Sequence, residues 1–189
     1  IAGLIAGTPM TIACTYAPLP ELTEVERLSA EEADNAVDAG EFILIHDGEK
    51  IKVARGINSL TTTTQDKGAA FKKIKIVEAV DMIGHDIRLT CEDSYIGKYA
   101  NSYDNKCVLI AAIKGYLEGL ELAGILAAGK STCEIDLAAQ ENYLKSKGTD
   151  TSAMSAQEIK EANTDDQVFL ACSVKILDAI EDISINVTI

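Results

Sequence analysis

The chain has 189 residues, with 17 basic and 30 acidic side chains and a formal net charge of −13. Its 47% apolar and 25% charged residues are typical of a globular protein that buries a core. This composition argues against disorder, and the acidic balance argues against a general nucleic-acid-binding protein, because such proteins are usually basic.

The N-terminus carries a short apolar run, residues 1–5. This run is far shorter than the roughly 20 residues that a membrane-spanning helix needs. No positively charged region precedes it, so it does not have the pattern of a signal peptide. The chain begins with Ile1 and not with methionine, and we therefore expect it to be part of a longer protein.

The cysteines are odd in number and none is paired in a C-x-x-C motif; they stand at positions 14, 91, 107, 133 and 172. This pattern predicts buried thiols in a reducing compartment and not a disulfide framework. His46 and His85 belong to no cluster with the spacing of metal ligands, so we predict no metal site.

Local signals predict the elements of the first third of the chain. Ser29 and Glu32 form a capping box, which starts a short helix that should end at Gly40. Residues 42–46 and 51–54 read as two strands. Asp47 and Gly48 between them form a strong hairpin signal, because both turn positions tolerate positive φ.

Hydrophobic periodicity predicts the elements of the middle. Residues 61–64 form a β-branched run suited to a strand or an extended link. Residues 72–77 alternate basic and apolar side chains, which predicts a half-buried strand. A helix over residues 81–94, a long helix from 106 to about 128 and a strand over 132–137 should follow. Cap candidates for the long helix lie between Asn101 and Asn105.

The last third is polar and turn-rich at first and then alternating. Ser155 and Glu158 repeat the capping box and predict a short helix within residues 138–166. Residues 168–176 and 183–189 alternate apolar and polar side chains, which predicts two strands. A strand with one apolar face needs a sheet to join. We therefore predict an α+β fold with mixed or antiparallel sheets packed against helices.

One stretch matches a nucleotide-binding motif. Residues 124–131, with Gly124 and Ser131 at the ends, satisfy G-x-x-x-x-G-K-[ST], so a nucleotide-binding enzyme fragment is one alternative. The motif needs a strand before it and a helix after it, and here the predicted order is reversed. The second interpretation is a helix end, with Gly129 as its terminating residue and Lys130 near the negative end of the dipole.

The remaining polar pairs favour no active site. Adjacent acids diverge on a helix, so we interpret them as solvated surface. These pairs are Glu31–Glu32, Glu92–Asp93, Asp165–Asp166 and Glu181–Asp182. We predict no catalytic residues, no cofactor and no enzymatic activity.

The order of several segments resembles the contractile tail sheath proteins of phages and phage-tail-like particles, such as R-type bacteriocins. The segments are AGTP…TYAPLP within residues 6–20, VARGINSLT at 53–61, FKKI…DMI…DIR within 71–88, and YIGK…N…IKGYL within 95–117. Residues 138–166 match this family weakly. The resemblance covers most of residues 1–125.

The resemblance implies that the chain is the C-terminal part of a sheath subunit. Residues 1–62 would end the middle domain, called subtilisin-like for its architecture alone, and residues 63–189 would form the sheath C-terminal domain. Such subunits form stacked six-fold rings around an inner tube, and contraction drives the tube through a target envelope. The implied partners are further subunits, the inner tail tube protein, and baseplate and tail terminator proteins, without nucleic acid or membrane insertion. Assembly would occur in the bacterial cytoplasm, with release on lysis.

The resemblance also implies that terminal arms add strands to the sheets of neighbouring subunits. The candidate subunit-linking residues are Ile183, Ile185, Val187 and Ile189; the alternative is that they pair only within their own chain. Candidate tube-facing residues are Lys98, Lys106 and Lys114, with ordinary solvated lysines as the alternative. A generic strand-pairing interaction domain, which would form small closed oligomers, remains a further alternative function.

Overall fold

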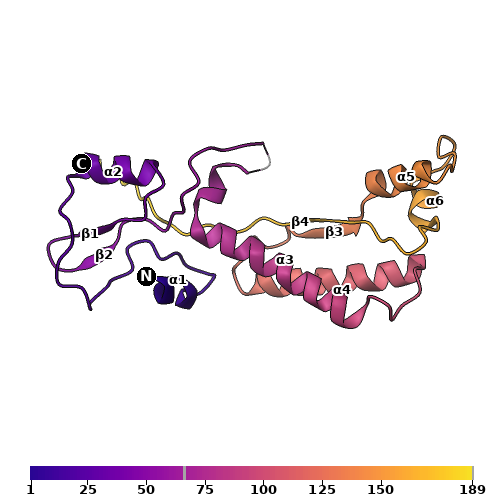
Figure 1. Ribbon diagram of the computed structural model, residues 1–189, viewed down its shortest axis with the longest axis horizontal. Coiled ribbons are helices and arrows are strands. Elements are labelled where there is room, and N and C mark those ends of the chain that lie inside the picture. The colour runs from indigo at the N-terminus through magenta and orange to yellow at the C-terminus, as the bar shows by residue number, and fades with distance from the viewer. Residues whose placement is uncertain (66, 189) are drawn as a thin grey trace. The chain divides into compact units, whose positions relative to one another are not determined.

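The computed structural model describes residues 1–65 and 67–188 of the chain (Figure 1). Two compact units are present. The first holds Ile1–Met82 together with the C-terminal segment that begins at Asp178, and the second holds Ile83–Leu177. Among the described residues, no helix combines the length and the apolar character that a membrane span requires.

The helices at the start of the first unit are α1, Ala2–Gly7, and α2, Ala30–Asp38. The predicted capping box begins α2. The Ser29 hydroxyl accepts a hydrogen bond from the Glu32 amide, and the Glu32 carboxylate accepts one from the Ser29 amide at 2.8 Å. Gly40, with φ +79°, follows the end of α2. The predicted helix and both of its end signals are confirmed.

A short hairpin follows α2. Strands β1, Leu44–His46, and β2, Ile51–Val53, pair antiparallel, with Leu44 opposite Val53 and His46 opposite Ile51. In the turn, Asp47 Oδ1 accepts hydrogen bonds from the amides of Glu49 and Lys50. The predicted hairpin is confirmed. Its β2 face forms the core of the first unit together with other buried residues: Cys14, Leu19, Ala54, Ile76 and Ala79.

The strand predicted over residues 72–77 is wrong. A short 3-10 helix, η1, Ala69–Lys72, leads into the long helix α3, Ile74–Ser94. Alternation over six residues does not distinguish a strand from a helix, and the packing of the buried side chains decides in favour of a helix here. Ile76, Ala79 and Ile83 are buried at spacings of three and four, so they share one helix face. The helix predicted over residues 81–94 is confirmed as the later part of α3.

The second unit contains α4, Tyr103–Leu122, whose N-cap hydroxyl on Ser102 accepts from the Asn105 amide. This helix begins at the predicted caps but ends before residue 128, and Gly124 follows its end with φ +75°. The sequence prediction missed α5, Leu137–Ser146, because the predicted strand extended over its N-cap, Asp136. Helix α6, Ala156–Glu161, carries the predicted capping box.

Strands β3, Thr132–Ile135, and β4, Leu170–Ser173, form the antiparallel sheet of the second unit. Helix α4 packs on β3, and the core between them includes Leu117 and Cys133. The predicted strands at 132–137 and 168–176 are confirmed in shorter form. The chain thus has the predicted α+β fold with small antiparallel sheets.

Candidate functional site

Three acidic side chains attach residues 178–182 to the first unit. Lys73 Nζ lies 2.5 Å from an Asp178 carboxylate oxygen and 2.8 Å from Glu181 Oε2. The Arg55 guanidinium pairs with Asp182 and lies 3.5 Å from Glu181 Oε2. The Thr15 hydroxyl donates to Glu181 Oε1. We call residues 178–182 the anchor, because each of these bonds joins the C-terminal segment to the N-terminal part of the first unit.

Glu181 is the centre of this anchor. Its side chain is only 10% exposed, whereas that of Asp182 is 82% exposed. Burial lowers the pKa of Lys73, but the hydrogen bonds and charges of Asp178 and Glu181 together raise it above its usual value. The hydrogen bond from Arg55 lowers the pKa of Asp182. The expectation of solvated surface is therefore wrong for Glu181.

The residues after the anchor have the opposite character. Ile183, Ile185 and Val187 are 76%, 78% and 79% exposed. Residues 183–188, which we call the tip, are not in a strand, and no hydrogen bond joins their main chain to the rest of the described chain. The predicted strand is therefore not formed within the single chain. Ile189, the fourth candidate linking residue, lies outside the described residues.

The three candidate tube-facing lysines separate into two groups. Lys98 and Lys114 are exposed. Lys106 is only 3% exposed, and its Nζ donates to Thr164 Oγ1 at 3.1 Å and to Gln140 Oε1 at 3.4 Å. We therefore remove Lys106 from the tube-facing candidates, because a side chain buried inside the second unit does not face a partner. For Lys98 and Lys114 the role stays a prediction.

The segment that matches the nucleotide-binding motif forms a loop whose amides already donate hydrogen bonds to a side chain of the same protein. Helix α4 precedes it and β3 follows it, the reverse of the order that the motif needs. The Glu121 carboxylate accepts hydrogen bonds from the amides of Gly129, Lys130 and Ser131 at 2.7, 3.2 and 2.9 Å. Hydrogen bonding from Ser131, together with the amides of Gly129 and Lys130, lowers the pKa of Glu121 to about 2. The chain's own carboxylate therefore stands where a phosphate would bind.

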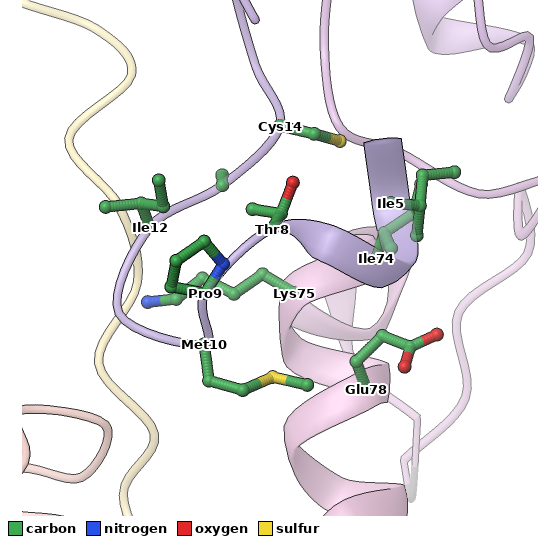
Figure 2. Close-up of a pocket in the computed structure, with 10 residues that line it drawn as sticks. Ile5, Thr8, Pro9, Met10, Ile12, Cys14, Ile74, Lys75 and Glu78 are labelled. Carbon is green, nitrogen blue, oxygen red and sulfur yellow. The ribbon is translucent and has the colours of Figure 1, made fainter. Parts of the chain in front are cut away.

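The first unit has a small hollow between the α1 segment and the start of α3 (Figure 2). Ile5, Met10 and Ile74 contribute apolar walls, and Lys75 and Glu78 contribute polar atoms. Its volume of about 20 Å³ is enough for one water molecule and too small for an organic ligand. Among the described residues, no three His, Cys, Asp or Glu side chains are placed to hold a metal ion.

A larger groove lies beside β4 in the second unit. Its volume is about 850 Å³, and α3, α4 and β4 contribute apolar and aromatic walls that include Ile87, Tyr95, Leu109 and Leu170. Strand β4 is mostly exposed. An exposed strand next to an apolar groove offers both main-chain groups and apolar contacts to an added segment.

Sequence reasoning missed the basic side of the anchor. Arg55 and Lys73 are 127 and 105 residues from their partners Asp182 and Asp178, so no local spacing links them. The sequence shows basic character over residues 51–75 and acids near the C-terminus, but charge alone does not identify a pair.

Comparison with known proteins gives concordant results. The model of the phage tail sheath C-terminal domain family matches residues 66–189. The chain is 45% identical over 187 residues to a tail sheath protein of the Clostridium phage phiCD119, covering 99% of this chain and 52% of that protein. It therefore spans about half the length of that relative.

Solved structures of sheath proteins have a similar fold. The sheath tail protein of Desulfitobacterium hafniense is 25% identical with a TM-score of 0.63, and the match covers 71% of this chain and 33% of that one. The helical sheath of the anti-feeding prophage in its contracted state is 16% identical with a TM-score of 0.66, covering 96% of this chain and 46% of that one. The second match is evidence for the fold alone.

Proposed function

Because the chain belongs to the phage tail sheath family, through the C-terminal domain of that family, we propose that it works as part of the structural subunit of a contractile tail. The subunits would polymerise as stacked hexameric rings around an inner tube and contract to drive the tube through a target envelope. Residues 1–62 would end the subtilisin-like domain and residues 63–189 would form the C-terminal domain.

The single observation that carries this proposal is the exposed tip that follows a fixed anchor. Three aliphatic side chains of the tip are more than three-quarters exposed, and the anchor fixes the place where the tip begins. Burying each such side chain contributes about 1.5–3 kcal/mol, so the tip has much to gain from a partner. A second copy of the chain is the partner that a homopolymer offers.

We propose that the tip adds as a strand to the sheet of a neighbouring subunit, at the free edge of β4. The first unit is a poorer acceptor, because the amides of Tyr16 and Leu19 already bond to the carbonyls of Val53 and Ile51 on β2. Beside β4, the groove would take the apolar side chains of the tip. A contact that joins two different surfaces generates a helical filament where the rotation does not close.

The remaining partners follow from the same role. Lys98 and Lys114 are the exposed residues that we propose to contact an acidic inner tube. Baseplate and tail terminator proteins would meet the two ends of the sheath. The protein would assemble in the bacterial cytoplasm as part of a tail or tail-like particle and leave the cell on lysis, without a cofactor and without catalysis.

Negative-stain electron microscopy of the full-length protein tests this function, alone and with its tube protein. We expect tubes or stacked six-fold rings at high protein concentration. Monodisperse monomers or closed dimers under every condition would contradict the proposal and favour a generic strand-pairing domain. Reversing the charges of Lys98 and Lys114 should weaken co-assembly with the tube, and unchanged co-assembly would remove these two residues from the proposal.

A further inference from the structure

Two cysteines face each other across the β3–β4 sheet. The register places Cys133 directly opposite Cys172. The Asp136 amide bonds to the Phe169 carbonyl, so that pair occupies a hydrogen-bonded position of the ladder. Residue pairs along an antiparallel ladder alternate between hydrogen-bonded and non-hydrogen-bonded positions. The cysteine pair lies three residue pairs away and therefore occupies a non-hydrogen-bonded position.

That position has the geometry that a disulfide requires. Opposed residues at non-hydrogen-bonded positions have Cα atoms about 4.5 Å apart, and disulfides span Cα distances of about 4.4–6.8 Å. The two Sγ atoms are already 2.9 Å apart. Bond formation therefore requires little movement of either strand.

The two thiols differ in access to solvent. Cys133 is fully buried, at 0% exposure, whereas Cys172 is exposed. Burial, together with the neighbouring Cys172, raises the pKa of Cys133 to about 12. The thiolate is the nucleophile in thiol–disulfide exchange, so Cys172 is the sulfur that meets an external reagent first.

We propose that Cys133 and Cys172 are a modification site, at which an oxidised low-molecular-weight disulfide converts the two thiols into a cross-strand disulfide. The Cys172 thiolate attacks one sulfur of the reagent, which forms a mixed disulfide and expels one small thiolate. Cys133 then loses its proton to solvent and attacks Cys172 Sγ, which expels the second small thiol. Two cysteines are oxidised, and the reagent is reduced to two thiols.

Cys91 is the competing partner. It is a half-buried residue of α3, and burial together with the charge of nearby Cys172 raises its pKa. It has no ladder position opposite Cys172, so the register favours Cys133. Cys107 is an exposed residue of α4 and serves as a matched control for a cysteine without this geometry.

The test treats the reduced full chain with glutathione disulfide, blocks the remaining thiols and maps the linked peptides by mass spectrometry. We expect a disulfide between the peptides of Cys133 and Cys172. The variant Cys172→Ser should abolish this disulfide, and the control variant Cys107→Ser should still form it. The thermal midpoint should rise by about 5–10 °C in the oxidised protein and return on reduction.

Three outcomes would overturn the proposal. These are a mixed disulfide that persists on Cys172, a bridge between Cys91 and Cys172, and a bridge between two chains on a non-reducing gel. Because the experiment concerns a single chain, its result does not depend on whether the protein assembles into a sheath.

Discussion

The anchor and the tip are neighbours in sequence and opposites in chemistry. Residues 178–182 place Glu181 between Arg55, Lys73 and Thr15, and both of its carboxylate oxygens have partners within the chain. Residues 183–188 present aliphatic side chains to solvent and make no main-chain hydrogen bond within the described chain. The difference separates the part of the C-terminal segment that the fold of one chain uses from the part that is left for the proposed partner.

A substitution in the tip should have the largest effect on assembly. Ile185→Lys places a charge where the proposed contact is apolar, which should weaken polymerisation of the full-length protein more than about a hundredfold. Sedimentation and electron microscopy measure this loss. Asn186→Lys, on the other face of the same segment, should polymerise nearly normally. Equal loss in both variants would show that general charge repulsion, and not the apolar face, is responsible.

The next effect concerns the centre of the anchor. Glu181→Gln keeps the side-chain size but removes the charge between two cations, which should cost about 1–3 kcal/mol of unfolding free energy. Urea denaturation measures this loss, and limited proteolysis should show earlier cleavage after residue 177. If the variant unfolds at the wild-type urea concentration and its C-terminus stays protected, the anchor does not hold the segment.

Acid should weaken only the Asp182 end of the anchor. The pKa of Asp182 is lowered in the folded chain, so its contribution is complete above about pH 4, the usual value for Asp, and is lost as the pH falls through the lowered value. The pKa of Lys73 is raised, so its contribution is complete below about pH 10 and is lost as the pH rises through the raised value. Because the Asp182 side chain is 82% exposed, this loss is small, and NMR should show only a slight shift of the amide resonances next to Asp182 below pH 4.

The smallest effect is expected at the edge of the anchor. The Asp182 side chain is 82% exposed, so Asp182→Asn should change the thermal midpoint by less than about 1 °C. Differential scanning calorimetry measures the thermal midpoints of Asp182→Asn and Glu181→Gln side by side, as a matched pair of variants. A larger shift for Asp182→Asn than for Glu181→Gln would reverse the ranking of the two carboxylates.

Elements with local causes could be predicted from the sequence. The capping boxes at Ser29 and Ser155 and the hairpin at Asp47 depend on residues within four positions of one another, and the structure confirms them. The start of α3 could not be predicted, because six alternating residues fit either period until the buried face of Ile76 and Ala79 is known. The alternation of residues 183–189 identified an apolar face but not its partner.

The candidate site was predictable only in part, for the same reason. The exposed apolar tip follows from its own residues, but Lys73 and Arg55 reach their acidic partners across more than 100 residues. Lys106 has the sequence context of a surface lysine, and only the folded chain shows that it is buried, with Gln140 and Thr164 as its hydrogen-bond partners. The Cys133–Cys172 pair depends on strand register, which no spacing of cysteines reveals.

The Glu121 loop has a mechanical consequence. Three successive amides of the segment that enters β3 bond to one carboxylate at the end of α4. A pull along β3 would therefore have to break several of these bonds before the loop could extend. We therefore expect this junction to extend less under tension than a loop without such bonds, and to pass force from β3 to α4.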